Sequence, residues 1–111
     1  MSIWDLQYGR RARALIDTDA KNEADDQFAI VHALLSPSLD VRGLIPAHFG
    51  TRRGQDSMDQ SRREIELLLR LLKLEGRVKV ADGAAFALPD VKTAVDCAGA
   101  RLILEEAMKD D

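Results

Sequence analysis

The sequence predicts a small α/β domain with a parallel sheet, and three observations predict that class. The chain has 111 residues, which is enough for one domain. Hydrophobic residues make up 46% of the chain, which excludes a disordered polypeptide. Short apolar runs alternate with stretches of helical periodicity, in the order strand, helix, strand, helix, strand, helix. That order is typical of parallel strands joined by crossover helices.

The first strand and the first helix are predicted from a buried run and a helical stripe. Residues Ala12–Thr18 (ARALIDT) form a short apolar run that ends in acidic residues, as a buried strand would. Residues 24–35 follow as a helix, and Pro37 stops it because proline cannot continue a helix. The residues expected to face the core recur at i, i+3, i+6 and i+7 and are Phe28, Val31, Leu34 and Leu35.

The middle of the chain predicts a second strand over 41–46 and a leucine-rich helix over 58–74. A loop over 47–55 joins the two elements, and Gly76 is expected to end the helix. Apolar residues surround much of this helix, so we expect it to be well buried. They form a stripe of Ile65, Leu68, Leu69 and Leu72, widened by Leu67, Leu71 and Leu74.

The last third of the chain predicts a third strand over 77–81, a loop over 82–90 and a helix over 93–109. Thr93 is expected to cap this helix, with Asp96 three residues later as a weak capping box. No fourth strand follows the helix. We therefore expect residues 1–111 to be the N-terminal part of a longer domain, truncated at its C-terminus.

The position of a functional site follows from this topology. Ligands of open parallel sheets bind beyond the carboxyl ends of the strands. The loops after Ile16, Ile45 and Val80 are therefore the candidate loops.

Charge and cysteine content exclude several classes of function. The chain has 16 Lys and Arg against 19 Asp and Glu, a net charge of −3, which argues against a nucleic-acid partner. No apolar run is long enough to span a membrane, and the first residues lack a secretory signal pattern, so a cytoplasmic location is expected. Cys97 is the one cysteine, which excludes a disulfide within the chain.

Four aspartates gather where the first strand ends and the first helix begins: Asp17, Asp19, Asp25 and Asp26. Strand alternation directs Asp17 and Asp19 to the same side of the chain. Carboxylates this close repel one another, and a hard divalent cation with its preference for oxygen ligands removes the conflict. The alternative is that Asp25 or Asp26 caps the helix while Asp17 and Asp19 are solvated. For the four together, a metal site is the prediction.

The stretch LIDTDAKNEADDQFAIVHALL resembles the N-terminal signature of the inosine-uridine-preferring nucleoside hydrolases. That signature is an apolar strand, Asp-x-Asp, a short loop, Asp-Asp and a helix. More weakly, GLIPAHFG, MDQSRREIELLLRLL and RVKVADGA resemble the elements that follow it. The resemblance implies a nucleoside-hydrolase-like, Rossmann-like fold that hydrolyses the N-glycosidic bond of ribonucleosides, purine and/or pyrimidine, with Ca²⁺. It also implies a homo-oligomer.

The resemblance implies roles for individual residues. Asp19 would be the general base that takes a proton from a metal-bound water, and Asp25 would bind a ribose hydroxyl. The loop over 20–24 is longer than in the family motif and would place Asn22 over the pocket. His48, in the loop after the second strand, is the nearest polar candidate for another substrate contact. The implied calcium ligands are Asp17, Asp19 and Asp26.

Two other functions compete with this one. A haloacid-dehalogenase-like, Mg²⁺-dependent phosphatase also opens with a strand and Asp-x-Asp, and Asp17 would then be the nucleophile. Lys21 occupies a place where those phosphatases usually have Thr or Val. The non-enzymatic alternative is an inactive, truncated module that binds a cation weakly. The nucleoside hydrolases draw further ligands and a leaving-group acid from later in their fold, so the isolated chain is expected to lack part of the machinery.

Overall fold

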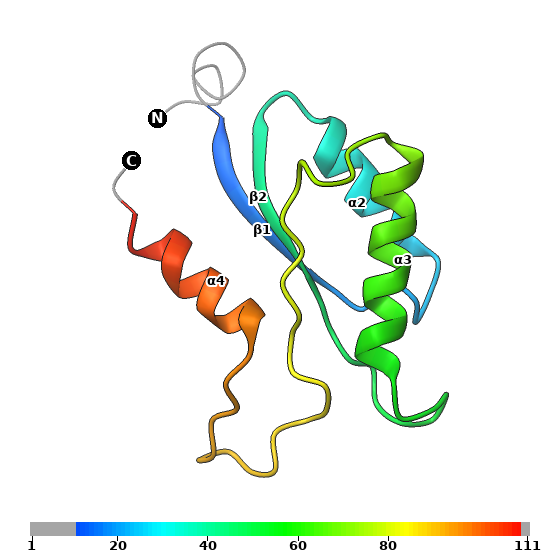
Figure 1. Cartoon of the computed structure of the whole chain (residues 1–111), viewed down its shortest axis with the longest axis vertical. Coiled ribbons are helices and arrows are strands. Elements are labelled where there is room, and N and C mark those ends of the chain that lie inside the picture. The colour runs from blue at the N-terminus through cyan, green and yellow to red at the C-terminus, as the bar shows by residue number, and fades with distance from the viewer. Residues whose placement is uncertain (1–10, 110–111) are drawn as a thin grey trace.

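The computed structural model describes residues 11–109 (Figure 1). These residues form two strands and three helices, in the order strand, helix, strand, helix, helix. The expected absence of a secretory signal concerns residues 1–10, which lie outside the described residues. None of the helices within 11–109 has the length and apolar character needed to cross a membrane. The elements are β1 (Ala12–Thr18), α2 (Asp25–Leu35), β2 (Leu39–Pro46), α3 (Ser57–Leu71) and α4 (Ala98–Ala107).

The sheet consists of β1 and β2, which pair in parallel from Ala12 opposite Leu39 to Thr18 opposite Pro46. The parallel sheet and the bounds of the first strand are confirmed, and β2 begins two residues before its predicted start at 41. The predicted third strand is wrong as a full strand. Residues 79–83, the third segment, run beside β2 but form a single bridge, between Leu44 and Val80.

The short pairing of the third segment has a local cause. The Leu44 N–H donates to the Lys79 carbonyl at 2.9 Å, and the Leu44 carbonyl accepts from the Ala81 N–H at 3.0 Å. Pro46 is the next residue of β2 in line, and it has no N–H to donate. Its carbonyl still accepts from Gly83 at 3.1 Å. The segment therefore stays alongside β2 without a continuous ladder.

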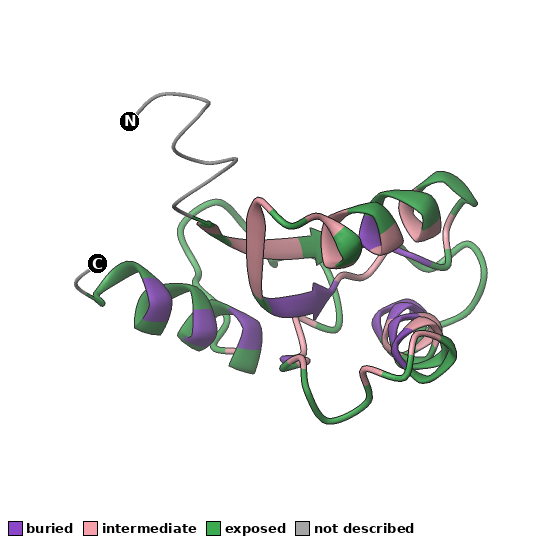
Figure 2. Ribbon diagram, turned by 90° about the horizontal axis from the view of Figure 1, so that it is seen from above, coloured by how far each residue is buried: buried purple, intermediate pink, exposed green. Residues whose placement is uncertain are grey.

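Helices cover both faces of the sheet, α2 and α3 on one face and α4 on the other (Figure 2). The larger core lies between the sheet and the α2–α3 layer and contains Ala20, Ile30, Leu44, Ile65 and Leu69. A smaller core under α4 contains Ile45, Ala81 and Leu102, with Leu15 beside it. The chain is therefore a small α/β structure with helices packed on a two-stranded parallel sheet.

The predicted core stripe of α2 is confirmed at Leu34, which packs against the core, and is wrong at Phe28 and Leu35. Phe28 is 78% exposed and Leu35 is 65% exposed. The buried residue of the helix is Ile30, and Leu34, one turn later, packs beside it. Ile30 and Leu34 share a face because they are four residues apart. The helix is oriented with this face toward the core, and Phe28 faces solvent.

The α3 helix ends earlier than predicted, and Gly76 is not its terminator. Lys73 adopts a left-handed conformation with φ of 59°. The Lys73 N–H bonds the Arg70 carbonyl, and the Leu74 N–H bonds the Leu69 carbonyl. This is the Schellman pattern, which satisfies the last carbonyls of a helix. The prediction that this helix is well buried is confirmed at Ile65 and Leu69 and is wrong at Leu71, which is 71% exposed.

The last helix is shorter than predicted, and its predicted cap is wrong. α4 begins at Ala98, after Cys97, which makes no side-chain cap hydrogen bond. The Thr93 hydroxyl instead donates to Asp90 at 2.9 Å, and the Asp90 carboxylate also accepts from two backbone N–H groups. The Thr93 side chain is therefore hydrogen-bonded within this local turn and does not cap a helix.

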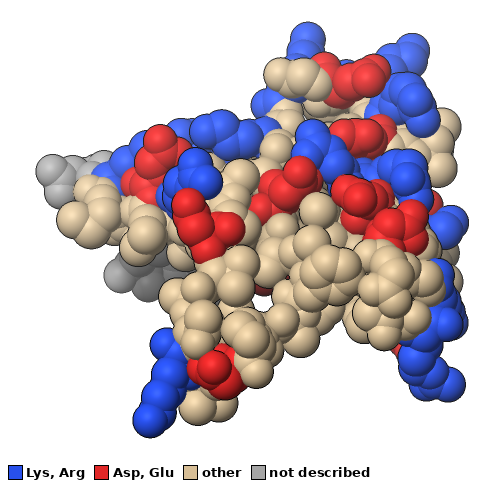
Figure 3. All heavy atoms as spheres, turned by 60° about the horizontal axis from the view of Figure 1, so that its bottom comes forward, with Lys and Arg blue, Asp and Glu red and all other residues tan. Residues whose placement is uncertain are grey.

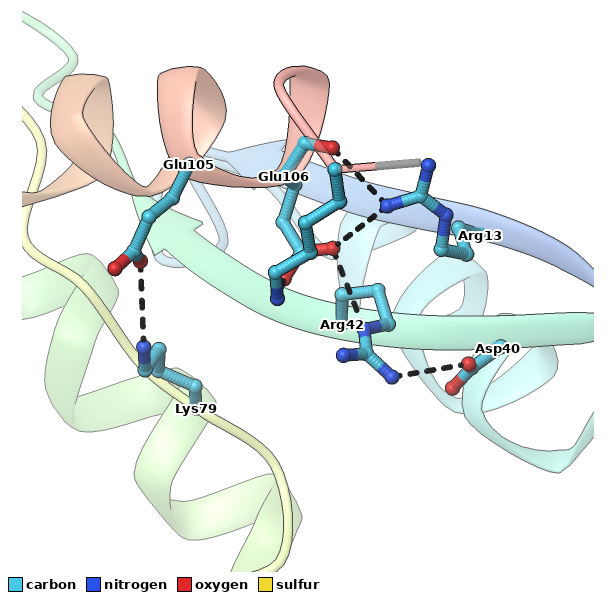
Figure 4. A network of polar contacts seen from close by, with 7 residues as sticks. Arg13, Asp40, Arg42, Lys79, Glu105 and Glu106 are labelled. Carbon is cyan, nitrogen blue, oxygen red and sulfur yellow. Dashed lines mark hydrogen bonds and ion pairs between the residues drawn. The ribbon is translucent and has the colours of Figure 1, made fainter. Parts of the chain in front are cut away.

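A cluster of charges fastens α4 to the sheet (Figure 4). The Glu106 side chain is 10% exposed and pairs with Arg13 of β1 at 3.2 Å and Arg42 of β2 at 3.4 Å. Lys109 donates to the same carboxylate at 2.6 Å. The hydrogen bond and charge of Lys109, with the charge of Arg42 and the hydrogen bond from Arg13, lower the pKa of Glu106 below its ordinary 4.5. Glu106 is therefore ionised throughout the neutral range.

We expect Glu106→Gln to lower stability at pH 7, with a deficit that shrinks in acid. A carboxyl whose pKa is depressed by folding contributes stability above its unfolded pKa and loses it as pH falls through the folded value. Urea unfolding at several pH values between about 7 and 3 measures the difference. Glu105→Gln is the matched control, because Glu105 is 65% exposed and pairs with Lys79 at 3.7 Å. Parallel pH curves for the wild type and E106Q would contradict the assignment.

Candidate functional site

A pocket of about 320 Å³ lies where the strands of the sheet end. Figure 3 looks toward this end of the molecule and shows a hollow framed by uncharged atoms. All three predicted loops contribute to it, since parallel strands bring their carboxyl ends to one edge. Larger depressions lie elsewhere on the surface, so its position rather than its size marks the site. The lining residues are Asp17, Ile45, Ala47, His48, Gly83, Ala84, Cys97, Gly99, Ala100 and Ile103.

Asp17 and His48 are the predicted site residues that the structure brings to this pocket. Asp17 is the penultimate residue of β1 and is exposed, while His48 is half-buried. The Gly50 N–H donates to His48 Nδ1 at 3.3 Å. Because Nδ1 accepts this bond, neutral His48 carries its proton on Nε2. The pocket thus combines a carboxylate with an imidazole that can donate.

Small residues keep the floor of the pocket open. A Cβ added to Gly99 would lie 2.6 Å from the Ile45 side chain, and one added to Gly83 would lie 2.6 Å from the Pro46 carbonyl oxygen. Real Cβ atoms do not approach other atoms this closely. The two glycines therefore allow α4 and the third segment to pack directly against the end of β2.

Asp19 and Asn22 belong to a tight turn beyond β1. The Asn22 N–H donates to the Asp19 carbonyl at 2.8 Å, and the Asn22 side-chain amide donates to Asp19 Oδ2 at 3.1 Å. Arg53 donates to the Asn22 carbonyl at 2.7 Å and so ties this turn to the loop after β2. Neither Asp19 nor Asn22 lines the pocket that holds Asp17.

Asp25 and Asp26 open α2, and neither is its N-cap. Ala24 takes that position, without a side-chain cap hydrogen bond. The buried Thr18 hydroxyl donates to Asp26 Oδ2 at 2.6 Å and fixes that carboxylate at the end of β1. Asp25 is exposed. Both carboxylates lie in the first helical turn, where the helix dipole favours negative charge.

The four aspartates of the motif do not form a cation site as they stand. Within residues 11–109, no three His, Cys, Asp or Glu side chains lie together in a way that could hold a metal ion. The strand ends at Thr18, so Asp19 leaves the alternation that would have kept it beside Asp17. Carboxylates suit Ca²⁺ chemically. Within residues 11–109 they are not gathered around one point, as several ligands of one Ca²⁺ ion would have to be.

Two residues at the site escaped the sequence analysis. Thr18 orients Asp26, and its position inside the Asp-x-Asp motif was the one signal that could have indicated it. Cys97 lines the pocket from the residue just before α4. Nothing in the sequence around Cys97 indicates this, because a long loop separates it from the strands it approaches.

Comparisons of the chain with protein families, curated protein sequences and solved structures give no match.

Proposed function

We propose that this chain belongs to a ribonucleoside N-ribohydrolase and carries the catalytic carboxylate and part of the sugar site. The observation that carries the proposal is the motif D-T-D-(five residues)-D-D, located on the connection from β1 to α2 at the carboxyl edge of a parallel sheet. The proposed nucleoside-hydrolase-like fold rests on the same motif and on the order of the elements, because the comparisons give no match.

The proposed chemistry assigns each polar residue a task. Asp19 takes a proton from the attacking water as the N-glycosidic bond breaks, and the carboxylates stabilise the positive charge that develops on the sugar. Asp25 accepts a hydrogen bond from a ribose hydroxyl. His48, with Nε2–H as its donor, contacts the substrate from the pocket that it lines together with Asp17. Asn22 holds the Asp19 side chain through its 3.1 Å hydrogen bond.

The proposal includes binding of Ca²⁺ by three of the aspartates, and this binding can be tested separately from hydrolysis. Asp17, Asp19 and Asp26 supply oxygen ligands of the type that Ca²⁺ prefers. Asp26 and Asp19 already accept hydrogen bonds from Thr18 and Asn22. A cation therefore has to draw these side chains together and find further ligands. A rise in melting temperature with Ca²⁺ is the measurement that detects such binding.

A Mg²⁺-dependent phosphatase is the second candidate, and one observation favours it. Asp17, the first aspartate of Asp-x-Asp, is the motif carboxylate that lines the pocket. That position suits a nucleophile that attacks a phosphoryl group. The Asp25–Asp26 pair has no task in that reaction, which is why we place it second.

An assay of sugar and phosphate release tests the proposal. The intact protein that carries this chain is incubated with inosine or uridine, with Ca²⁺ or with a chelator, and free ribose is quantified. Ribose release is the expected result, and the effect of the chelator shows whether the reaction uses a bound cation. Phosphate release from a phosphomonoester with Mg²⁺, without ribose release, would indicate the phosphatase. Absence of both activities together with an unchanged melting temperature in Ca²⁺ would identify the inactive module.

A further inference from the structure

The outer edge of β1 is open among residues 11–109, because β2 is the one strand of this part that pairs with it. The Ala12 N–H and the Thr18 carbonyl both bond to residues that flank β2, so the even-numbered residues of β1 turn their main chain toward β2. The one irregularity of the pairing adds a residue to β2 and none to β1, which leaves the alternation along β1 unbroken. The N–H and C=O groups of Leu15 and Asp17 consequently face away from β2.

A partly apolar depression of about 250 Å³ lies beside this edge, on the face of the sheet that α4 covers. Leu15 packs beside the smaller core on that face and lines the depression together with Ile103 and Ala107 of α4. Ile103 is 45% exposed, so α4 leaves apolar surface uncovered next to β1. Exposed apolar surface beside an open strand edge indicates a place where further polypeptide packs.

The sequence that precedes β1 has the pattern of a strand followed by a tight turn. In the stretch WDLQY, the apolar residues Trp4, Leu6 and Tyr8 alternate with polar residues. This period of two is typical of a strand with one apolar face. Gly9 follows directly, and glycine at the first central position is typical of the type II′ turn that joins antiparallel strands. The pattern therefore predicts a strand that folds back along β1.

The predicted turn and the open edge agree in register. A two-residue turn that begins at Gly9 joins the Tyr8 carbonyl to the Arg11 N–H. Arg11 is odd-numbered, so in the same alternation its main chain faces outward like that of Leu15. A turn shifted by one residue in either direction would need an even-numbered main chain, which faces β2 instead. Counting back from the turn sets Trp4 opposite Leu15, on the face of the sheet that carries the depression.

We propose that residues 2–8 pair as an antiparallel strand with the outer edge of β1. They are as many residues as β1 itself contains, so the segment can follow the whole edge. Trp4 and Leu15 exchange two main-chain hydrogen bonds, and the indole ring packs into the depression against Ile103. Ser2 lies opposite Asp17, so the added strand borders the pocket that Asp17 lines. This pairing does not depend on the proposed hydrolase activity.

Fluorescence of the full chain tests the position of Trp4, which is its one tryptophan. We expect the native chain to emit at shorter wavelength than the urea-unfolded chain and to be quenched less by acrylamide. Ile103→Asp is expected to shift the emission toward the unfolded value, because it places a charge against the indole. Leu104→Asp is the matched control and should leave the emission unchanged, because Leu104 is 65% exposed and does not line the depression. Native emission equal to that of the unfolded chain would overturn the proposal.

Hydrogen exchange tests the strand pairing itself. The amides of Leu15 and Asp17 are expected to be protected in the native chain, to the same degree at every protein concentration. Gly9→Val puts a β-branched residue where the turn needs a positive φ, and we expect it to lower their protection by about fivefold or more. The Ile16 amide, which faces β2, should keep its protection in this variant, and circular dichroism checks that the variant is folded.

Two results of the exchange experiment would contradict the proposal. Rapid exchange at Leu15 and Asp17 in a chain whose Trp4 is buried would mean that the segment docks without pairing as a strand. Protection that appears only as the protein concentration rises would mean that a second copy occupies the edge. Either result would overturn the pairing of residues 2–8 with β1.

Discussion

Replacing Leu44 by alanine is expected to lower the free energy of unfolding by about 3 kcal/mol, within the range for buried leucines. Leu44 is fully buried and belongs to the core that joins the sheet to α2 and α3. Its main chain also carries the one bridge to the third segment. Loss of the Leu44 side chain beyond Cβ therefore leaves a cavity between the sheet and the α2–α3 layer. Urea denaturation followed by circular dichroism measures the change.

Leu71→Ala is the matched control for this variant. It removes the same atoms from a leucine that is 71% exposed. We expect a change within about 0.5 kcal/mol, as for other surface positions. If Leu44→Ala costs no more than Leu71→Ala, the core described here is wrong.

Replacing Asp19 by asparagine is expected to reduce ribose release by about 10²–10⁴-fold, the usual contribution of a positioned acid or base. Asparagine has nearly the same shape as aspartate, and one side-chain oxygen remains to accept the 3.1 Å hydrogen bond from Asn22. The turn should therefore persist while the proton acceptor is lost. Steady-state kinetics should show the fall in kcat, with an unchanged circular dichroism spectrum.

Glu23→Gln is the control in the same turn region. Glu23 is exposed, and neither catalysis nor sugar binding has been assigned to it. We expect E23Q to retain wild-type activity. Full activity in D19N, or an equal loss in E23Q, would remove Asp19 from its proposed role.

The sequence determined those elements that are specified by residues close together in the chain. The bounds of β1 were predicted correctly, because an apolar run followed by acidic residues marks both its burial and its end. The parallel order followed from strands separated by helical stretches. The same topology placed Asp17 and His48 at one edge of the sheet, where they line a common pocket. The predicted roles of these residues in substrate or metal binding remain predictions.

Tertiary packing decided the features that depend on contacts between distant segments. The periodicity of α2 allowed more than one apolar face, and packing against the sheet selected Ile30 over Phe28. The third segment became a single bridge because Pro46 of β2 has no N–H to continue the ladder. Asp19 left the strand direction at a turn held by Asn22. The sequence alone therefore determined the order of β1, α2, β2, α3 and α4 and the positions of the carboxylates along the chain. Only the tertiary structure decided which faces are buried and which carboxylates meet, because those outcomes depend on packing between segments far apart in the chain.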